Sequence, residues 1–294
     1  MNYQWYPGHM TKAVRMMQEN IKLIDLIIEL VDARIPMSSR NPDIDELGRN
    51  KSRIVLLNKS DLADPAQNKK WMRYFEEQGA HALEVNSKSG AGVKSINGLV
   101  QEACKEKIER DRKRGIVNRP VRAMVVGIPN VGKSTFINSF AGKACTKTGN
   151  KPGVTKGKQW IRLNKSLELL DTPGILWPKF DDQEAGMRLA FIGSMNDEII
   201  VQEGLACDLI RVVTQLYPRA LAQRYGWEEA LPDGDLDQQP RLLTEMEAAE
   251  VLERIAVSRK CFTKGEEPDL PRAAALLIDD FRSGRLGRMT LERR

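Results

Sequence analysis

Closely spaced cysteines are missing from this sequence of 294 residues. Its cysteines stand far apart, at Cys104, Cys145, Cys207 and Cys261. Without a close pair, they suggest neither a zinc site nor a disulfide framework. A reducing compartment fits this usage, and we expect a cytoplasmic protein.

Long apolar runs are missing as well. The longest, from Ile24 to Val31, contains Asp25 and Glu29 and falls far short of the roughly 18 residues that a membrane span needs. The N-terminus also lacks the charged-then-apolar pattern of a signal peptide. With 41% hydrophobic residues, the chain is expected to form a soluble globular protein of one large and one smaller domain, with no membrane partner.

Sequence signatures of RNA binding are missing too, because no zinc finger, base-stacking motif or similar pattern occurs. The charge balance nevertheless weakly favours binding to nucleic acid, since 46 lysines and arginines exceed 40 acidic residues and give a net charge of +6. This excess favours a polyanionic partner such as nucleic acid, and a merely soluble surface explains it equally well.

Two mostly apolar runs, 26–33 and 53–57, have the length and the Ile, Leu and Val content of buried strands. Each is followed by a polar segment and then by a helical stretch, such as 67–79, which ends at Gly79. A further helix is expected at roughly 94–114, before an apolar strand at 121–127. The alternation predicts an α/β domain with a doubly wound, mostly parallel sheet.

The segment 127–134 matches G-x-x-x-x-G-K-[ST] between that strand and a helix start, which is the context that the P-loop motif requires. Its glycines let backbone N–H groups surround a β-phosphate at the helix N-terminus. Lys133 is expected to reach the β- and γ-phosphates, and Ser134 to bind Mg²⁺. The predicted phosphate-binding residues here are Asn130, Val131, Gly132, Lys133, Ser134 and Thr135.

The segment "NKSD" at 58–61 follows a buried strand and indicates guanine rather than adenine. The Asp61 carboxylate can accept both N–H donors of guanine, and adenine would leave it buried and unpaired. Lys59 is expected along the base and ribose, and Asn58 is expected to brace the loop. A lone "NKSD" would usually be a surface turn, but here a P-loop accompanies it.

Three weaker segments complete a set of guanine-nucleotide motifs, although each alone would be a loop by default. "DTPG" at 171–174 offers Asp171 for Mg²⁺ through water and the Gly174 N–H for the γ-phosphate. "PGVTK" offers Thr155 as a switch residue on the metal. A loop with Asn86, Ser87 and Lys88 is expected to cap the guanine, through the backbone N–H of Ser87.

The order of these motifs is unusual, because the guanine-binding segments precede the P-loop and "DTPG" comes last. This order predicts a circularly permuted, Ras-like domain whose old termini are joined by the helix and basic linker at 94–120. The new chain ends then emerge beside the segment after "DTPG", which moves when the γ-phosphate is lost.

With "WYPGHMTKA" at 5–13 and "DARIPMSSRNP" at 32–42, nearly the whole chain resembles the circularly permuted ribosome-assembly GTPases, most closely the ribosome biogenesis GTPase A family. The resemblance implies GTP hydrolysis coupled to late assembly of the bacterial large ribosomal subunit, with its precursor's rRNA and proteins as partners. One departure is that the family's usual S-A-K is Asn86-Ser87-Lys88 here, which puts that loop's side-chain contacts in doubt.

The glutamine that orients the attacking water in Ras-like enzymes is replaced here by Ile175, so another residue must do this. His9 in "PGHM" is the candidate, since the permutation brings this arm near the "DTPG" segment and similar proteins are thought to use this histidine. The alternative is an N-terminal anchor that only packs.

In related GTPases an asparagine at the position of Asn130 binds K⁺, and a loop-shaping role is the alternative.

The last third of the chain has the apolar stripes of amphipathic helices, for example over 205–216, separated by a linker at 232–240. We expect an arm at 1–20, the GTPase domain at 21–180 and an all-α, rRNA-binding domain at 181–294 in a monomer. The basic residues that can contact phosphates are Arg254, Arg259, Lys260, Lys264, Arg282, Arg285 and Arg288. A solvated face is the alternative for them, and a nucleotide-gated RNA-binding module is the alternative function.

Overall fold

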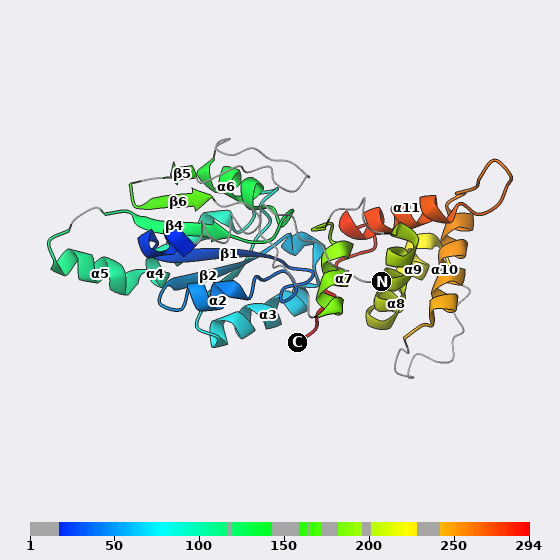
Figure 1. Ribbon diagram of the computed structural model, residues 1–294, viewed down its shortest axis with the longest axis horizontal. Coiled ribbons are helices and arrows are strands. Elements are labelled where there is room, and N and C mark those ends of the chain that lie inside the picture. Colours follow the sequence, from blue (N-terminus) through cyan, green and yellow to red (C-terminus); the bar gives the residue numbers. More distant parts are fainter. Residues whose placement is uncertain are drawn as a thin grey trace. The chain divides into compact units, whose positions relative to one another are not determined.

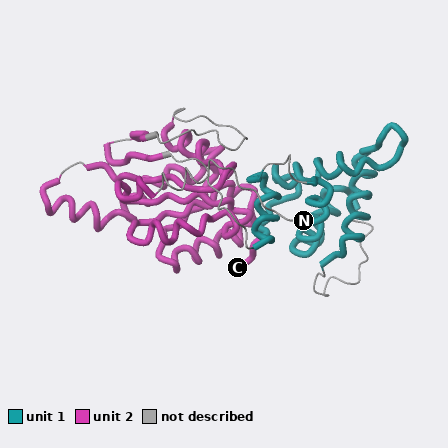
Figure 2. The backbone as a smooth tube through the Cα atoms, in the orientation of Figure 1, with its two compact units in different colours: residues 1–3, 182–291 teal, residues 4–181, 292–294 magenta. Residues whose placement is uncertain are grey.

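A computed structural model describes residues 18–116, 119–142, 159–163, 165–171, 182–195, 201–227 and 242–294. These fall into two compact units (Figure 2). Among the described residues, the sheet unit is formed by those from 18 to 171 together with Glu292–Arg294, and the helical unit by those within Asp182–Leu291. The last three residues are therefore grouped with the sheet unit rather than with the helices that precede them.

The sheet of the first unit has the strand order β3-β2-β1-β4-β6-β5 (Figure 1). Every neighbouring pair is parallel except β5 and β6. The strands are β1 (Leu26–Asp32), β2 (Ser52–Asn58), β3 (His81–Glu84), β4 (Val121–Val126), β5 (Gln159–Arg162) and β6 (Leu167–Asp171). All seven residues of β1 are buried, as expected of a central strand covered on both faces.

Helices connect the parallel strands. They are α2 (Asp43–Leu47), α3 (Pro65–Glu77), α4 (Ile96–Ala103), α5 (Lys105–Lys113) and α6 (Lys133–Ala141). Short 3₁₀ helices lie at η1 (Ile21–Leu23), η2 (Ser60–Leu62) and η3 (Val93–Ser95). The predicted helix at 94–114 is interrupted, because the backbone of Cys104 leaves helical geometry between α4 and α5.

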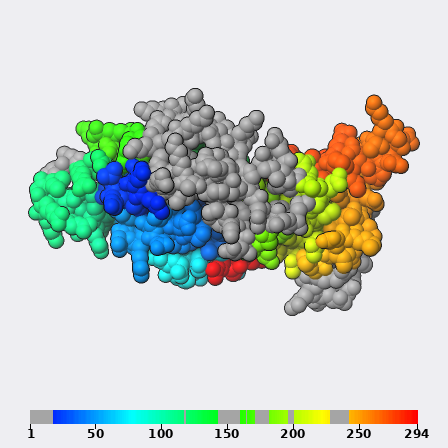
Figure 3. Space-filling model, in the orientation of Figure 1, coloured from blue at the N-terminus to red at the C-terminus, as the bar shows by residue number. Residues whose placement is uncertain are grey.

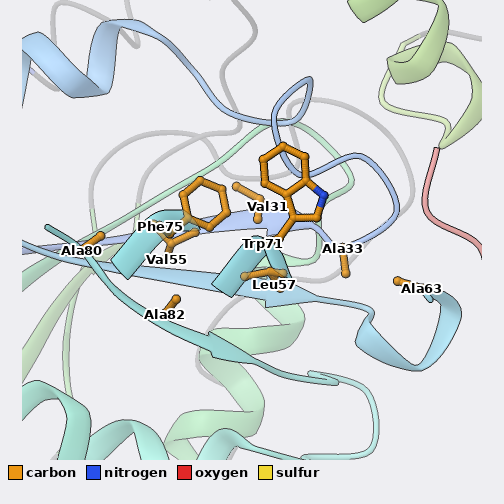
Figure 4. Packing of buried hydrophobic residues seen from close by; sticks show 9 residues of the cluster. All are labelled: Val31, Ala33, Val55, Leu57, Ala63, Trp71, Phe75, Ala80 and Ala82. Atoms are coloured by element: carbon orange, nitrogen blue, oxygen red, sulfur yellow. The ribbon is translucent and has the colours of Figure 1, made fainter. Parts of the chain in front are cut away.

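Helix α3 packs its aromatic face on the sheet. It begins at Pro65 because the Asp64 side chain accepts the N–H of Ala66 at 2.8 Å, and proline suits the first helical position. The rings of Trp71 and Phe75 lie over buried aliphatic side chains of the strands (Figure 4). Their core cluster consists of Val31, Ala33, Val55, Leu57, Ala63, Trp71, Phe75, Ala80 and Ala82.

The helical unit contains α7 (Gln183–Phe191), α8 (Gln202–Leu216), α9 (Ala220–Tyr225), α10 (Glu245–Ser258) and α11 (Leu270–Arg282). Helix α10 starts at a capping box in which Thr244 and Glu247 bond each other's backbone N–H. Buried Asp280 accepts hydrogen bonds from Arg224, Tyr225 and Arg285 and ties α9 to α11. In the described part of the chain, every helix is too short or too polar to cross a membrane.

Candidate functional site

The candidate site lies where the parallel strands end. Because carboxyl ends of parallel strands share one edge of a sheet, the segments after β1, β2, β3 and β4 come together there. Asp32 pairs in register with Asn58, and Val125 pairs with Asp171. The predicted guanine and phosphate segments therefore meet, although about seventy residues separate them in the chain.

The P-loop follows β4 in a conformation that only certain residues adopt. Gly127 has φ 156°, Asn130 has φ 57° and Gly132 has φ 100°. A Cβ atom on Gly127 would lie 2.7 Å from the carbonyl oxygen of Leu30, and one on Gly132 would lie 2.6 Å from Nδ2 of Asn58. Both glycines are thus required by close packing as well as by backbone angle.

Lys133 begins α6 directly after this loop and is buried. Its Nζ donates to the carbonyl oxygens of Gly127 and Ile128, each at 3.1 Å. The ammonium group is thereby held over the loop, at a helix N-terminus that favours anions. Ser134 and Thr135 follow in the first turn of the helix.

Asn58 connects the P-loop with the loop after β3. Its Nδ2 donates to the carbonyl oxygen of Val131 at 2.8 Å. Its Oδ1 accepts from the N–H of Ser87 at 3.1 Å and from the Ser87 hydroxyl at 2.8 Å. With 2% exposure, this side chain is a buried brace rather than a surface group. In this structure the Ser87 N–H is bonded to Asn58, whereas the sequence assigned it to the guanine.

Lys59 makes a second connection to the P-loop. It adopts a left-handed backbone conformation with φ 58°, and its Nζ donates to the carbonyl oxygen of Asn130 at 3.0 Å. The same Nζ lies 3.0 Å from Oδ2 of Asp32. The contacts of Nζ with Asn130 and Asp32 thus hold the Lys59 side chain in an extended conformation across the site.

Asp32 is a residue of the site that sequence reasoning missed. It is fully buried at the end of β1 and binds the Arg34 guanidinium through two hydrogen bonds of 2.8 Å. Burial would raise the pKa of the Asp32 carboxyl, but Arg34 and Lys59 outweigh it and hold that pKa far below its usual range. The sequence feature that could have predicted Asp32 is an acidic residue at the end of a strand, two residues before an arginine.

Asp61 lies on η2 and is exposed, so its carboxylate is accessible to a base. Asn86 instead serves its own loop, because its Oδ1 accepts the N–H groups of Lys88 and Ser89 at 2.9 and 3.0 Å. The Ser60 N–H donates to the carbonyl oxygen of Val85 and joins the two loops that the sequence predicts to bind guanine.

Some predicted site residues lie outside the described residues, namely His9, Thr155 and Gly174. Asp171 is placed by its backbone at the end of β6, beside Val125. Ser134 is the second residue of α6, directly after the P-loop, and Asp171 is the last residue of β6. Hydroxyl and carboxylate groups are hard oxygen ligands of the kind that Mg²⁺ prefers. The residues present thus fit the magnesium ion that a GTPase domain uses with its nucleotide.

Comparison with known proteins supports the same interpretation. Residues 122–230 match the family described as "50S ribosome-binding GTPase". Ribosome biogenesis GTPase A of Bacillus cereus is 44% identical over 99% of this chain and 94% of its own length. The protein of that name from Priestia megaterium is 45% identical over 99% of this chain and 97% of its own.

Among solved structures, GDP-bound YlqF of T. maritima superposes with a TM-score of 0.64 at 26% identity. The match covers 94% of this chain and 98% of that one. The predicted fold, a permuted Ras-like GTPase domain followed by an all-α part, is confirmed. The chain is a GTPase and belongs to the ribosome biogenesis GTPase A family.

Proposed function

We propose that this GTPase hydrolyses GTP to GDP and phosphate during late assembly of the large ribosomal subunit. The observation that carries the nucleotide part is the pair of bonds from Asn58 and Lys59 to the carbonyl oxygens of Val131 and Asn130. These bonds join a segment suited to guanine with a segment suited to phosphates. The names of the full-length relatives support the ribosomal partner.

Guanine is bound by the segment after β2 and the loop after β3. Exposed Asp61 accepts the two N–H donors of the base, Lys59 lies along the base and ribose, and Asn58 holds the two loops together. Ser87 supports Asn58, and Asn86 shapes the loop that carries Lys88. Selectivity over adenine follows, because adenine offers no matching pair of donors to Asp61.

The phosphates are bound by Asn130–Thr135 together with Gly174. Lys133, whose Nζ lies at the carbonyl oxygens of Gly127 and Ile128, would bind the β- and γ-phosphate oxygens, and hydrogen bonds to these charged acceptors are strong. Ser134, Thr155 and, through water, Asp171 would hold Mg²⁺, which neutralises charge on the phosphates. Asn130 is the proposed ligand of K⁺, although its left-handed backbone also suits a loop-shaping asparagine.

His9 is the proposed water-orienting group, since the aliphatic side chain of Ile175 cannot hydrogen-bond water. Imidazole can accept or donate such a bond near neutral pH. The support for this assignment is the permutation, which places the N-terminal arm before β1; in the sheet only β4 separates β1 from β6, the strand that ends at Asp171 of "DTPG".

The helical unit is the proposed rRNA-binding part. The exposed basic residues on and after α10 include Arg254, Arg259, Lys260 and Lys264. The Arg254 guanidinium lies 4.7 Å from the centre of the Trp227 ring, and Arg259 donates to the carbonyl oxygen of Arg224 at 2.7 Å. Arg282 and Arg285 also bond other groups of the protein. Arg282 donates to the carbonyl oxygens of Ala190 and Phe191, and Arg285 forms ion pairs with Asp279 and Asp280. We assign the phosphate contacts to Arg254, Lys260, Lys264 and Arg288, which are exposed. A cytoplasmic monomer remains our expectation.

GTP turnover in the presence and absence of large-subunit precursor particles tests this function. We expect the precursor to accelerate hydrolysis strongly, and mature subunits to do so less. Lys133→Ala is the control, because loss of its charge at the phosphates should abolish turnover in both conditions. Turnover that the precursor leaves unchanged would contradict the assembly role while leaving GTP hydrolysis intact.

A further inference from the structure

The last three residues, Glu292–Arg294, form a C-terminal tail that belongs to the sheet unit. Thr290, two residues before the tail, is anchored within the helical unit, where the Tyr217 hydroxyl accepts its N–H at 2.8 Å and donates to its carbonyl oxygen at 3.1 Å. The chain therefore passes from one anchored segment directly into another.

Glu292 is the central residue of the tail. Its carboxylate accepts the N–H of Met37 at 2.6 Å and the N–H of Ser38 at 2.9 Å, and it also accepts the Ser38 hydroxyl. Only 8% of the residue is exposed. Hydrogen bonds from backbone amides to a buried carboxylate are among the stronger ones in proteins. Glu292 thus fixes the loop that follows β1.

The rest of the tail lies on α3. The Trp71 indole N–H donates to the carbonyl oxygen of Glu292 at 2.9 Å, and the Arg294 N–H donates to Oε1 of Gln67 at 3.0 Å. The Arg294 guanidinium lies 5.0 Å from the centre of the Trp71 ring and 3.8 Å from that of Tyr74. Figure 3 shows the red atoms of the chain end beside the cyan atoms that include α3.

The loop that Glu292 holds continues to the guanine segment. One residue beyond Ser38, the Ser39 hydroxyl accepts the N–H of Asp32 at 2.9 Å and donates to the carbonyl oxygen of Ile35 at 2.7 Å. The Asp32 carboxylate then pairs with Lys59. An unbroken series of hydrogen bonds and loop backbone therefore connects the tail with Lys59.

We propose that the C-terminal tail is a positioning element for guanine-nucleotide binding. Glu292 holds the loop after β1 so that Asp32 keeps Lys59 extended across the site, toward Asn130. This proposal rests on the assignment of Lys59 to the guanine site. Coupling between two equilibria is reciprocal, so a tail that strengthens nucleotide binding must itself be held more tightly when nucleotide is bound.

Binding of a fluorescent GDP analogue to full-length variants tests the proposal. Glu292→Ala should weaken GDP binding about five- to tenfold, at the lower end of typical coupling between sites, while kcat at saturating GTP stays unchanged. Glu292→Gln, which keeps one acceptor oxygen, should have a smaller effect in the same direction. The matched control is Glu250→Gln, an exposed glutamate on α10. Unchanged affinity in Glu292→Ala would overturn the proposal.

Hydrogen exchange at the Met37 and Ser38 amides is a second test. If the tail had only a structural role, exchange at these amides would not depend on GDP. In the wild type, GDP should slow exchange of both amides, by about the same factor as the loss of affinity in Glu292→Ala. Exchange that does not respond to GDP would also overturn the proposal.

A double-mutant cycle with Lys59→Ala separates this proposal from the site assignment. If Lys59→Ala weakens GDP binding and the two effects are not additive, the tail acts through Lys59. If Lys59→Ala weakens binding and the effects add, the tail proposal is wrong but the guanine site stands. If Lys59→Ala has no effect, the site assignment fails, and this proposal fails with it.

Discussion

Replacing Asn58 with alanine should remove the brace between the P-loop and the loop after β3. The variant loses three hydrogen bonds, one to Val131 and two to Ser87, at a position that is 2% exposed. Each such bond contributes about 1 kcal/mol to the free energy of unfolding. The expected loss is therefore about 3 kcal/mol, because no water can easily replace the amide in a buried position.

This loss should be visible as a lower melting temperature without nucleotide, because all three bonds join protein groups to one another. For a domain of 150–250 residues, 1 kcal/mol corresponds to about 2–4 °C, so Asn58→Ala should melt about 6–12 °C lower. Stabilisation by GDP should also shrink, because two loops that are no longer joined must be ordered when GDP binds.

Circular dichroism melts with and without GDP measure both effects. Asn50→Ala is the control, since Asn50 is exposed in a turn before β2 and should shift the melting temperature by little. A shift below about 2 °C in Asn58→Ala, or one equal to the control, would refute the reasoning. A lower melting temperature with undiminished stabilisation by GDP would restrict Asn58 to a structural role.

Three further predictions concern catalysis, the cation and pH. His9→Ala should slow single-turnover GTP hydrolysis by about 10²–10⁴-fold with GTP binding nearly intact, more so with precursor particles present, and equal stimulation of both proteins would remove His9 from catalysis. Potassium should accelerate hydrolysis relative to sodium at equal ionic strength, whereas equal rates would leave Asn130 with a loop-shaping role. Burial acts to raise the pKa of Asp280, but hydrogen bonds from Arg224 and Arg285 outweigh it and lower that pKa. The stabilisation by Asp280 is therefore present above about pH 4, and it is lost as the pH falls through the pKa of Asp280 in the folded protein. Urea unfolding should show that the stability difference between wild type and Asp280→Asn shrinks between about pH 5 and pH 2.

Sequence patterns predicted much of the sheet unit because its strands are short apolar runs and its motifs have fixed spacing. The strand before Asn58 and the strand before Gly127 were both evident, and the parallel arrangement brings their ends together. The break at Cys104 was not evident, since the periodic pattern continues across it while the backbone does not.

Contacts between distant side chains could not be predicted in the same way. The ion pair of Asp32 with Lys59 and the bonds of Glu292 to Met37 and Ser38 depend on how loops fold back, and no periodicity encodes them. The charged ending "ERR" would ordinarily indicate a solvated chain end. Only the structure shows Glu292 buried against the loop after β1.

We propose that guanine is bound by the segment after β2, which precedes the P-loop in the chain. Measuring the affinities of wild type and Asp61→Asn for GDP and for xanthosine diphosphate tests it most directly, because the amide of asparagine suits the 2-oxo group of xanthine. We expect the wild type to prefer GDP and Asp61→Asn to prefer the xanthosine nucleotide. An Asp61→Asn protein that binds GDP as tightly as the wild type, with no gain for xanthosine diphosphate, would contradict it.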